Sequence, residues 1–158
     1  MPPRVKPVTG RKPPARPERV AAFKLGLSAE SRAAMLLLAK GYRIAARRWR
    51  TPVGEIDIVA RRRRELVFVE VKARAEGALV SGYHAVDERK KRALRRAVHA
   101  YLAGLTPPPR TFRFDVAEVT LSGRLPAQVM HYDNVPLFPK GYYVARQSNS
   151  LDEVAGGQ

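Results

Sequence analysis

Residues 54–74, "GEIDIVARRRRELVFVEVKAR", place four consecutive arginines between two runs of alternating apolar residues. A period of two predicts β-strands over "EIDIVA" and "ELVFVEVKA", with the arginines as the hairpin loop between them. Successive side chains of a strand point to opposite faces, so one face of the second strand consists of valines and must be buried. The other face begins apolar and ends with Glu70 and Lys72, which concentrates charge at one end of the strand.

The pairing of these two strands decides whether their carboxylates meet. If Ala60 and Glu65 flank the arginine loop, Glu55 lies opposite Glu70, and Asp57 lies diagonal to Glu70 on the same face. A slip of one residue would turn Asp57 to the opposite face. We prefer the first register because it also pairs the isoleucines of one strand with valines of the other. Two or three carboxylates would then lie close together, which is unfavourable unless a cation or a proton relieves their repulsion.

Carboxylate oxygens without cysteine predict a hard divalent cation, Mg²⁺ or Mn²⁺, which keeps waters that substrate phosphate can replace. Lys72 could steer an attacking water or offset charge on phosphate. Glu30 is a further candidate, at the end of the buried stripe of a preceding helix. The structural alternative for Glu30 is a first-turn glutamate that satisfies the helix dipole. For Glu70 and Lys72 the alternative is a salt bridge between strands.

The remaining sequence predicts two helices and three more strands. The first helix begins at Ser28 and ends at Gly41, and a strand follows over 42–49. The second helix is capped by Asp87, and its buried stripe consists of Leu94, Ala97, Val98, Tyr101 and Leu102. "TFRFDVAEV" and "PAQVMHY" are the last two strands. The order α-β-β-β-α-β-β predicts an α/β or α+β domain with a mixed sheet flanked by helices.

The composition predicts one domain with basic ends. We expect residues 1–22, rich in proline and arginine, to form a disordered basic arm, residues 23–140 to form the domain, and residues 141–158 to form a flexible tail. The longest apolar run, 33–39, is far short of the roughly 20 residues that span a bilayer. No apolar stretch follows the basic N-terminus as a secretory signal would require. We therefore predict a cytoplasmic protein without a membrane partner.

A net charge of +16 predicts a polyanionic partner, nucleic acid first of all. The basic residues recur in several elements and no base-reading motif accompanies them, so we expect salt-dependent contacts to backbone phosphate. The predicted contacts are Arg47, Arg48, Arg74, Lys90, Lys91 and Arg95. Arg113 and Asp115 are predicted to form an ion pair, and the histidines are predicted to be structural or surface residues.

A family resemblance adds to these expectations. "SAESRAAMLLLAKGYRI", "GEIDIVA", "LVFVEVKAR", "RKKRALRRAVHAYL" and "FRFDVAEV" resemble the YraN-like family of uncharacterised bacterial proteins, over roughly residues 25–138. That family is similar to archaeal Holliday junction resolvases of the PD-(D/E)XK nuclease superfamily. The resemblance implies an α/β, restriction-endonuclease-like fold with a mixed central sheet flanked by helices.

The resemblance also implies roles for the acidic residues. Asp57 and Glu70 would coordinate Mg²⁺ or Mn²⁺, Lys72 would be the lysine of the E-x-K signature, and Glu30 would complete the catalytic site. Glu55 belongs to the family's G-E-[IL]-D pattern, and we place it behind the metal ligands. The implied activity is hydrolysis of phosphodiester bonds in DNA, branched or otherwise structured, by a homodimer. The alternative is a non-catalytic nucleic-acid-binding protein that retains the fold.

The sequence departs from the family pattern in two places. Arg47-Arg48-Trp49 stands where relatives have Arg-Asn before the aromatic residue, and four arginines replace the usual Asp or Gly of the hairpin turn. Neither departure touches the expected ligands, so both bear on substrate contacts rather than on chemistry.

Overall fold

The fold is a five-stranded mixed sheet between two helices, as the sequence predicts. The computed structural model describes residues 17–77, 87–121 and 128–138, so the predicted C-terminal tail lies outside the described residues. The elements are α1 (Pro17–Ala39), β1 (Arg43–Thr51), β2 (Gly54–Arg62), β3 (Glu65–Ala75), α2 (Glu88–Ala103), β4 (Thr111–Leu121) and β5 (Gln128–Tyr132). The strand order in space is β1-β2-β3-β4-β5. β3 and β4 are parallel, and the other neighbours are antiparallel.

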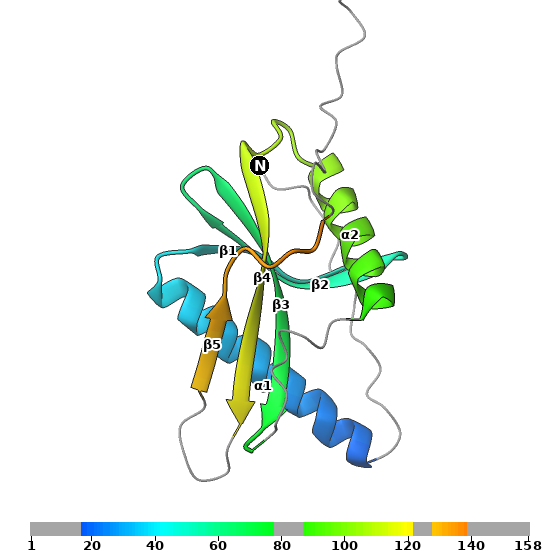
Figure 1. Ribbon diagram of the computed structural model, residues 1–158, viewed down its shortest axis with the longest axis vertical. Coiled ribbons are helices and arrows are strands. Elements are labelled where there is room, and N and C mark those ends of the chain that lie inside the picture. The colour runs from blue at the N-terminus through cyan, green and yellow to red at the C-terminus, as the bar shows by residue number, and fades with distance from the viewer. Residues whose placement is uncertain (1–16, 78–86, 122–127, 139–158) are drawn as a thin grey trace, which may run out of the picture.

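The two helices cover different faces of this sheet. Figure 1 shows α1 crossing behind β3, β4 and β5, while α2 stands beside the sheet next to β2. On the α1 side, Ala33 and Leu37 pack against Val67 and Val69, the valine face that the sequence predicts to be buried. On the α2 side, a second cluster forms around Phe68. Both faces of the central strands are therefore buried, which holds the charged end of β3 in a fixed place.

The second helix matches its prediction residue by residue. The Asp87 side chain accepts a hydrogen bond of 2.7 Å from the backbone N–H of Lys90, which satisfies one of the free donors of the first turn. Gly104 caps the C-terminal end. The predicted stripe is buried, namely Leu94, Ala97, Val98, Tyr101 and Leu102.

The first helix begins earlier than predicted. It starts at Pro17, so Ser28 lies inside the helix and is not its N-cap. Proline is favoured at the first helical position because its missing N–H needs no partner there. The predicted basic arm overlaps this helix over 17–22, and the rest of the arm lies outside the described residues. No helix in the described ranges has the length and apolar character required to cross a membrane.

The predicted end of this helix is confirmed. Gly41 has a φ of +81°, the left-handed conformation that glycine adopts without strain. The backbone N–H of Gly41 donates to the Leu38 carbonyl at 2.9 Å, and that of Tyr42 donates to the Leu37 carbonyl at 3.0 Å. This pair of hydrogen bonds is a Schellman motif, which satisfies two terminal carbonyls and turns the chain into β1.

The β2–β3 hairpin is tighter than predicted. Arg62 pairs with Glu65, so the turn consists of Arg63 and Arg64 alone. The expected register, in which Ala60 and Glu65 flank a four-arginine loop, is wrong by two residues. Exposed arginines can stand on a strand with their side chains in solvent, and the backbone ladder therefore continues into the arginine run. Because the shift is even, it leaves every side chain on its predicted face.

Candidate active-site cavity

A cavity of about 330 Å³ lies where α1, β2, β3 and α2 meet, and it gathers the predicted acidic residues. Its charged lining consists of Glu30, Arg48, Glu55, Asp57, Glu70 and Lys90, and we call it the carboxylate cavity. All four predicted carboxylates therefore share one cavity, although they come from three separate elements. Asp57 does not point away from Glu70 across the sheet. Continuing the observed register past its last pair would set Asp57, not Glu55, across from Glu70.

Glu70 is the buried centre of this cavity. Its residue is only 2% exposed, and its Oε1 receives two ammonium groups: Lys72 Nζ at 3.1 Å and the closer Lys90 Nζ. Burial by itself would lower the pKa of Lys90, but the attraction and hydrogen bond of the Glu70 carboxylate outweigh burial and raise that pKa. A buried carboxylate is tolerated only with such partners. Lys72 therefore stands beside the carboxylate as the E-x-K pattern implies, and Lys90 belongs to the cavity.

Asp57 is held at the point where the two strands separate. The β2–β3 ladder ends at the pair Ile58 and Val69, and Asp57 Oδ2 accepts the backbone N–H of Val71 at 2.8 Å. Burial, followed by repulsion from the Glu70 carboxylate, raises the pKa of Asp57 to about 7. A carboxyl group held near neutral pH between its two forms is typical of functional sites, although ion-pair networks also produce such shifts.

Glu30 enters the cavity from α1 and meets Arg48 of β1. Glu30 Oε2 and Arg48 Nε are 3.3 Å apart, an ion pair by distance that lacks hydrogen-bond geometry. Burial raises the pKa of Glu30, and the Arg48 charge offsets part of that rise. Arg48 has a φ of +51°, a strained conformation for a residue other than glycine. Glu30 is thus more than a first-turn glutamate, since its helix begins well before it, at Pro17.

Glu55 lies at the edge of the cavity and is engaged by a neighbour. Arg50 Nη2 donates to Glu55 Oε1 at 3.1 Å, and Arg50 Nε lies 3.0 Å from Oε2, an ion pair by distance without hydrogen-bond geometry. This contact offsets the charge of Glu55, and its position behind the metal ligands stays a prediction.

The donor set suits a hard divalent cation. In the part of the chain that the structure describes, no three His, Cys, Asp or Glu side chains are spaced as a ready metal-ligand group. Mg²⁺, however, is commonly bound by one or two carboxylates together with waters and substrate phosphate. Asp57 and Glu70 can provide those two carboxylates, and the lysines on Glu70 balance its charge in the absence of an ion.

The other predicted phosphate contacts lie outside the cavity, and each binds a group of this chain. The contacts are Arg47 with Ser31 Oγ (3.1 Å), Arg74 with Glu118 (3.2 Å), Lys91 with Glu88 (2.9 Å), and Arg95 with the Leu137 carbonyl oxygen (2.8 Å). A guanidinium carries five N–H donors and can hold such a partner together with a phosphate. Their role in binding nucleic acid stays a prediction.

Gly54 is a determinant of the cavity that sequence reasoning missed. A Cβ at this position would lie 2.7 Å from the carbonyl oxygen of Ala93 and 3.2 Å from Ala97 Cβ. The absence of a side chain lets the start of β2 approach α2, and this approach carries Glu55 and Asp57 towards Lys90. Gly54 is the first residue of the G-E-[IL]-D pattern, and its place directly before the acidic residues could have indicated a close contact between backbones at this point. Gly26 and Leu27 were missed as lining because the helix was predicted to begin after them.

The comparisons identify related sequences. The model of the uncharacterised protein family UPF0102 matches residues 29–119. A UPF0102 protein of Rhodopseudomonas palustris (strain BisB18) is 53% identical over 118 residues, which is 72% of this chain and 85% of the relative. One from Bradyrhizobium diazoefficiens is 58% identical over 99 residues, covering 62% and 73% of the two chains. One from Nitrobacter winogradskyi is 53% identical over 114 residues, covering 71% and 93%.

Proposed function

Because the chain belongs to the uncharacterised protein family UPF0102, whose description names no activity, we propose a function from the cavity itself. We propose a divalent-metal-dependent endonuclease that hydrolyses phosphodiester bonds in DNA, with branched or otherwise structured DNA as the implied substrate class. The family membership agrees with the YraN-like resemblance. The observation that carries the proposal is the convergence of Glu30, Asp57 and Glu70 on one cavity, with Lys72 and Lys90 on the buried Glu70.

In this proposal the residues divide the work between holding charge and placing water. Asp57 and Glu70 would hold Mg²⁺ or Mn²⁺, which when bound supplies Lewis-acid activation of the phosphate and of a water. Lys72 Nζ lies 3.1 Å from Glu70 Oε1, and it would orient that water or stabilise negative charge on the phosphate. Glu30 and Arg48 form the α1 wall. Lys90, which contacts Glu70 Oε1, would bind substrate phosphate once an ion offsets the charge of the Glu70 carboxylate.

The charge of the chain supports a nucleic-acid substrate. A net charge of +16 exceeds the magnitude of roughly 2 to 8 that solubility requires of a small domain. A homodimer, which the resemblance to resolvases implies, would suit cleavage of two strands.

A second candidate function is non-catalytic binding of nucleic acid. It is favoured by the satisfied state of Glu70, whose two lysine partners already neutralise it, and by the lack of a three-ligand group in the described residues. In this alternative the lysine–carboxylate cluster is a structural tie between α2 and β3.

Replacement of the Glu70 carboxylate distinguishes the two candidate functions, DNA cleavage and non-catalytic binding. Glu70→Gln keeps the size of the side chain and removes its charge, and Glu76→Gln at an exposed position after β3 is the matched control. Cleavage of a four-way DNA junction with Mg²⁺ should fall by on the order of 10²-fold or more in Glu70→Gln, while junction binding in EDTA should not weaken. If the wild-type protein cleaves none of junction, flap, duplex and single-stranded DNA with Mg²⁺ or Mn²⁺, the nuclease proposal is wrong and non-catalytic binding of nucleic acid is the function that remains.

A further inference from the structure

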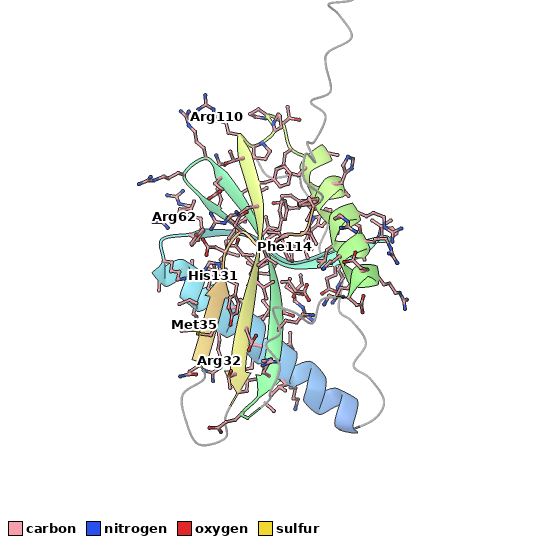
Figure 2. All side chains as sticks on the ribbon, in the orientation of Figure 1. Arg32, Met35, Arg62, Arg110, Phe114 and His131 are labelled. Atoms are coloured by element: carbon pink, nitrogen blue, oxygen red, sulfur yellow. The ribbon has the colours of Figure 1, made fainter. Side chains whose placement is uncertain are left out.

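A second cavity lies at the opposite end of the β2–β3 hairpin, and we call it the arginine cavity. It has a volume of about 530 Å³, and its charged lining consists of Arg62, Arg63, Arg64, Arg110, Arg113 and Glu65. Glu65 and Glu70 are five residues apart on β3, which corresponds to about 17 Å along an extended strand. The arginine cavity is therefore separate from the carboxylate cavity. Figure 2 shows Arg62 and Arg110 at the hairpin end of the molecule, away from Arg32 on α1.

The floor of this cavity is a guanidinium in a fixed position. Arg113 donates to Asp115 through Nε at 2.9 Å and through Nη2 at 3.2 Å, and Nη2 also donates to the Tyr42 hydroxyl at 2.8 Å. The Arg113 Nη1 group contacts Glu65. Hydrogen bonds from Arg113 to Asp115 raise the pKa of Arg113, so the guanidinium stays charged. The predicted ion pair of Arg113 and Asp115 is confirmed, and it orients the side chain.

Asp115 is itself locked from behind. It is fully buried, and it accepts the N–H of Asn134 at 2.9 Å and contacts His131 Nε2 at 2.8 Å. Lys40 Nζ lies 3.0 Å from His131 Nδ1, and an ammonium can only donate. His131 Nδ1 therefore accepts, and His131 Nε2–H donates to Asp115. This chain of contacts gives His131 the structural role that the sequence predicts and holds Arg113 rigidly.

The rim arginines lack acidic partners. In the described residues none of Arg62, Arg63, Arg64 and Arg110 forms an ion pair, and Arg62 stacks over the Tyr42 ring with its Cζ 5.4 Å from the ring centre. Glu65 is the only carboxylate among the lining residues, and Arg113 already neutralises it. Four positive charges without an acidic partner among the described residues therefore surround a cavity whose floor holds the charged Arg113, with one Nη1–H that these contacts leave free.

Arg63 adds an independent observation. Its φ is +56°, in a two-residue hairpin turn where glycine would adopt this conformation without strain. A solubilising arginine could stand at any exposed position without strain. An arginine at a strained position points to a use for its side chain.

We propose that the arginine cavity binds backbone phosphate of a nucleic acid, through Arg113 at the floor and Arg62, Arg63, Arg64 and Arg110 at the rim. Guanidinium groups match phosphate oxygens in two-point geometry. None of the exposed large apolar side chains, Leu25, Met35, Leu38, Val53 and Met130, lines this cavity, so nothing among the described residues there would enter a bilayer. The site concerns binding alone and shares with the proposed nuclease only the nucleic-acid partner.

The test uses the full chain, a short fluorescent DNA duplex and EDTA, so that cleavage cannot affect the result. The variant Arg63→Gly/Arg64→Ala is compared with Arg32→Ala/Arg96→Ala, which removes the same charge from exposed helix positions. The hairpin variant should weaken binding on the order of tenfold or more at low salt, and lower the slope of log affinity against log salt by about 2. The control pair should change affinity by less than about threefold.

Two further measurements keep the result unambiguous. Arg63→Gly alone should raise Tm, because it relieves the turn, while it weakens duplex binding; misfolding cannot produce that combination. Glu65→Gln should tighten binding by releasing Arg113. Equal losses in the hairpin and control variants would overturn the proposal, as would unchanged duplex binding with lost binding to phosphatidylglycerol vesicles. Because every measurement here is made in EDTA and reports binding alone, failure of the nuclease proposal leaves this test intact.

Discussion

Replacing Asp57 by asparagine should stabilise the protein, and the gain should grow with pH. The folded state holds the Asp57 proton up to a pKa of about 7, against an ordinary value of 3.8. Between these values the folded protein binds a proton that the unfolded chain has lost, so stability falls as pH rises through this window and is level above it. The asparagine side chain would carry no charge, and its oxygen could still accept the Val71 N–H.

The magnitude follows from the difference between the two pKa values. A separation of about three units at 1.36 kcal/mol each limits the effect to about 4 kcal/mol above neutral pH. Part of this penalty is already present at mildly acidic pH. Between about pH 5 and about pH 8 the gap between Asp57→Asn and wild type should therefore widen by about 2.5 kcal/mol, on the order of 10 °C in Tm.

The assay is thermal unfolding of wild type and variant in EDTA across this pH range, with the exposed Asp133→Asn as the control. A variant that is less stable than wild type at both pH values, or a gap that does not change with pH, would refute the raised pKa of Asp57 and its assigned causes, burial first and repulsion from Glu70 second. Repeating the series with Mg²⁺ should stabilise wild type and leave Asp57→Asn nearly unaffected, because an ion bound by the native state adds stability by mass action.

Two substitutions away from the ionisable cavity residues test the packing that holds both cavities. Gly54→Ala would place a Cβ 2.7 Å from the Ala93 carbonyl oxygen. We expect urea denaturation to show that the free energy of unfolding falls by about 1–3 kcal/mol. An unchanged free energy of unfolding would mean that β2 does not pack tightly against α2. Asp115→Ala would leave Arg113, His131 and the backbone N–H of Asn134 without their buried acceptor. The free energy of unfolding should fall by about 3–5 kcal/mol in the same measurement. A loss below about 1 kcal/mol would contradict the locking role of Asp115.

Much of the fold could be predicted because local patterns determine it. The Asp87 cap and the apolar stripe of α2 depend on spacing within one helix, and Gly41 ends α1 by its own conformational freedom. The start of α1 could not be read in this way. Proline and arginine usually indicate loose chain, and only Pro17 at the first helical position agrees with the helix that forms.

The hairpin shows which errors matter. The arginine run was predicted to be a loop, and the register was therefore displaced by two residues. A displacement of one would have dispersed the carboxylates, whereas a displacement of two moves them along the same face. Face assignment was robust because it depends on parity, while the partner of each carboxylate depends on the turn. The contact of Lys90 with Glu70 joins two elements far apart in sequence, so no local pattern could assign it.

Charge balance explains why the carboxylate cavity can be folded without an ion and still suit one. Glu30, Asp57 and Glu70 can carry three negative charges, and Arg48, Lys72 and Lys90 carry three positive ones, while Glu55 is neutralised by Arg50. With a divalent ion alone, these six side chains and the ion would have a net charge of +2. With an ion and a phosphodiester together, the net charge would be only +1. On the proposed function, ion and substrate would therefore assist each other's binding. Until both are bound, Lys90 in the cavity and Lys72 beside it would offset the charge of Glu70.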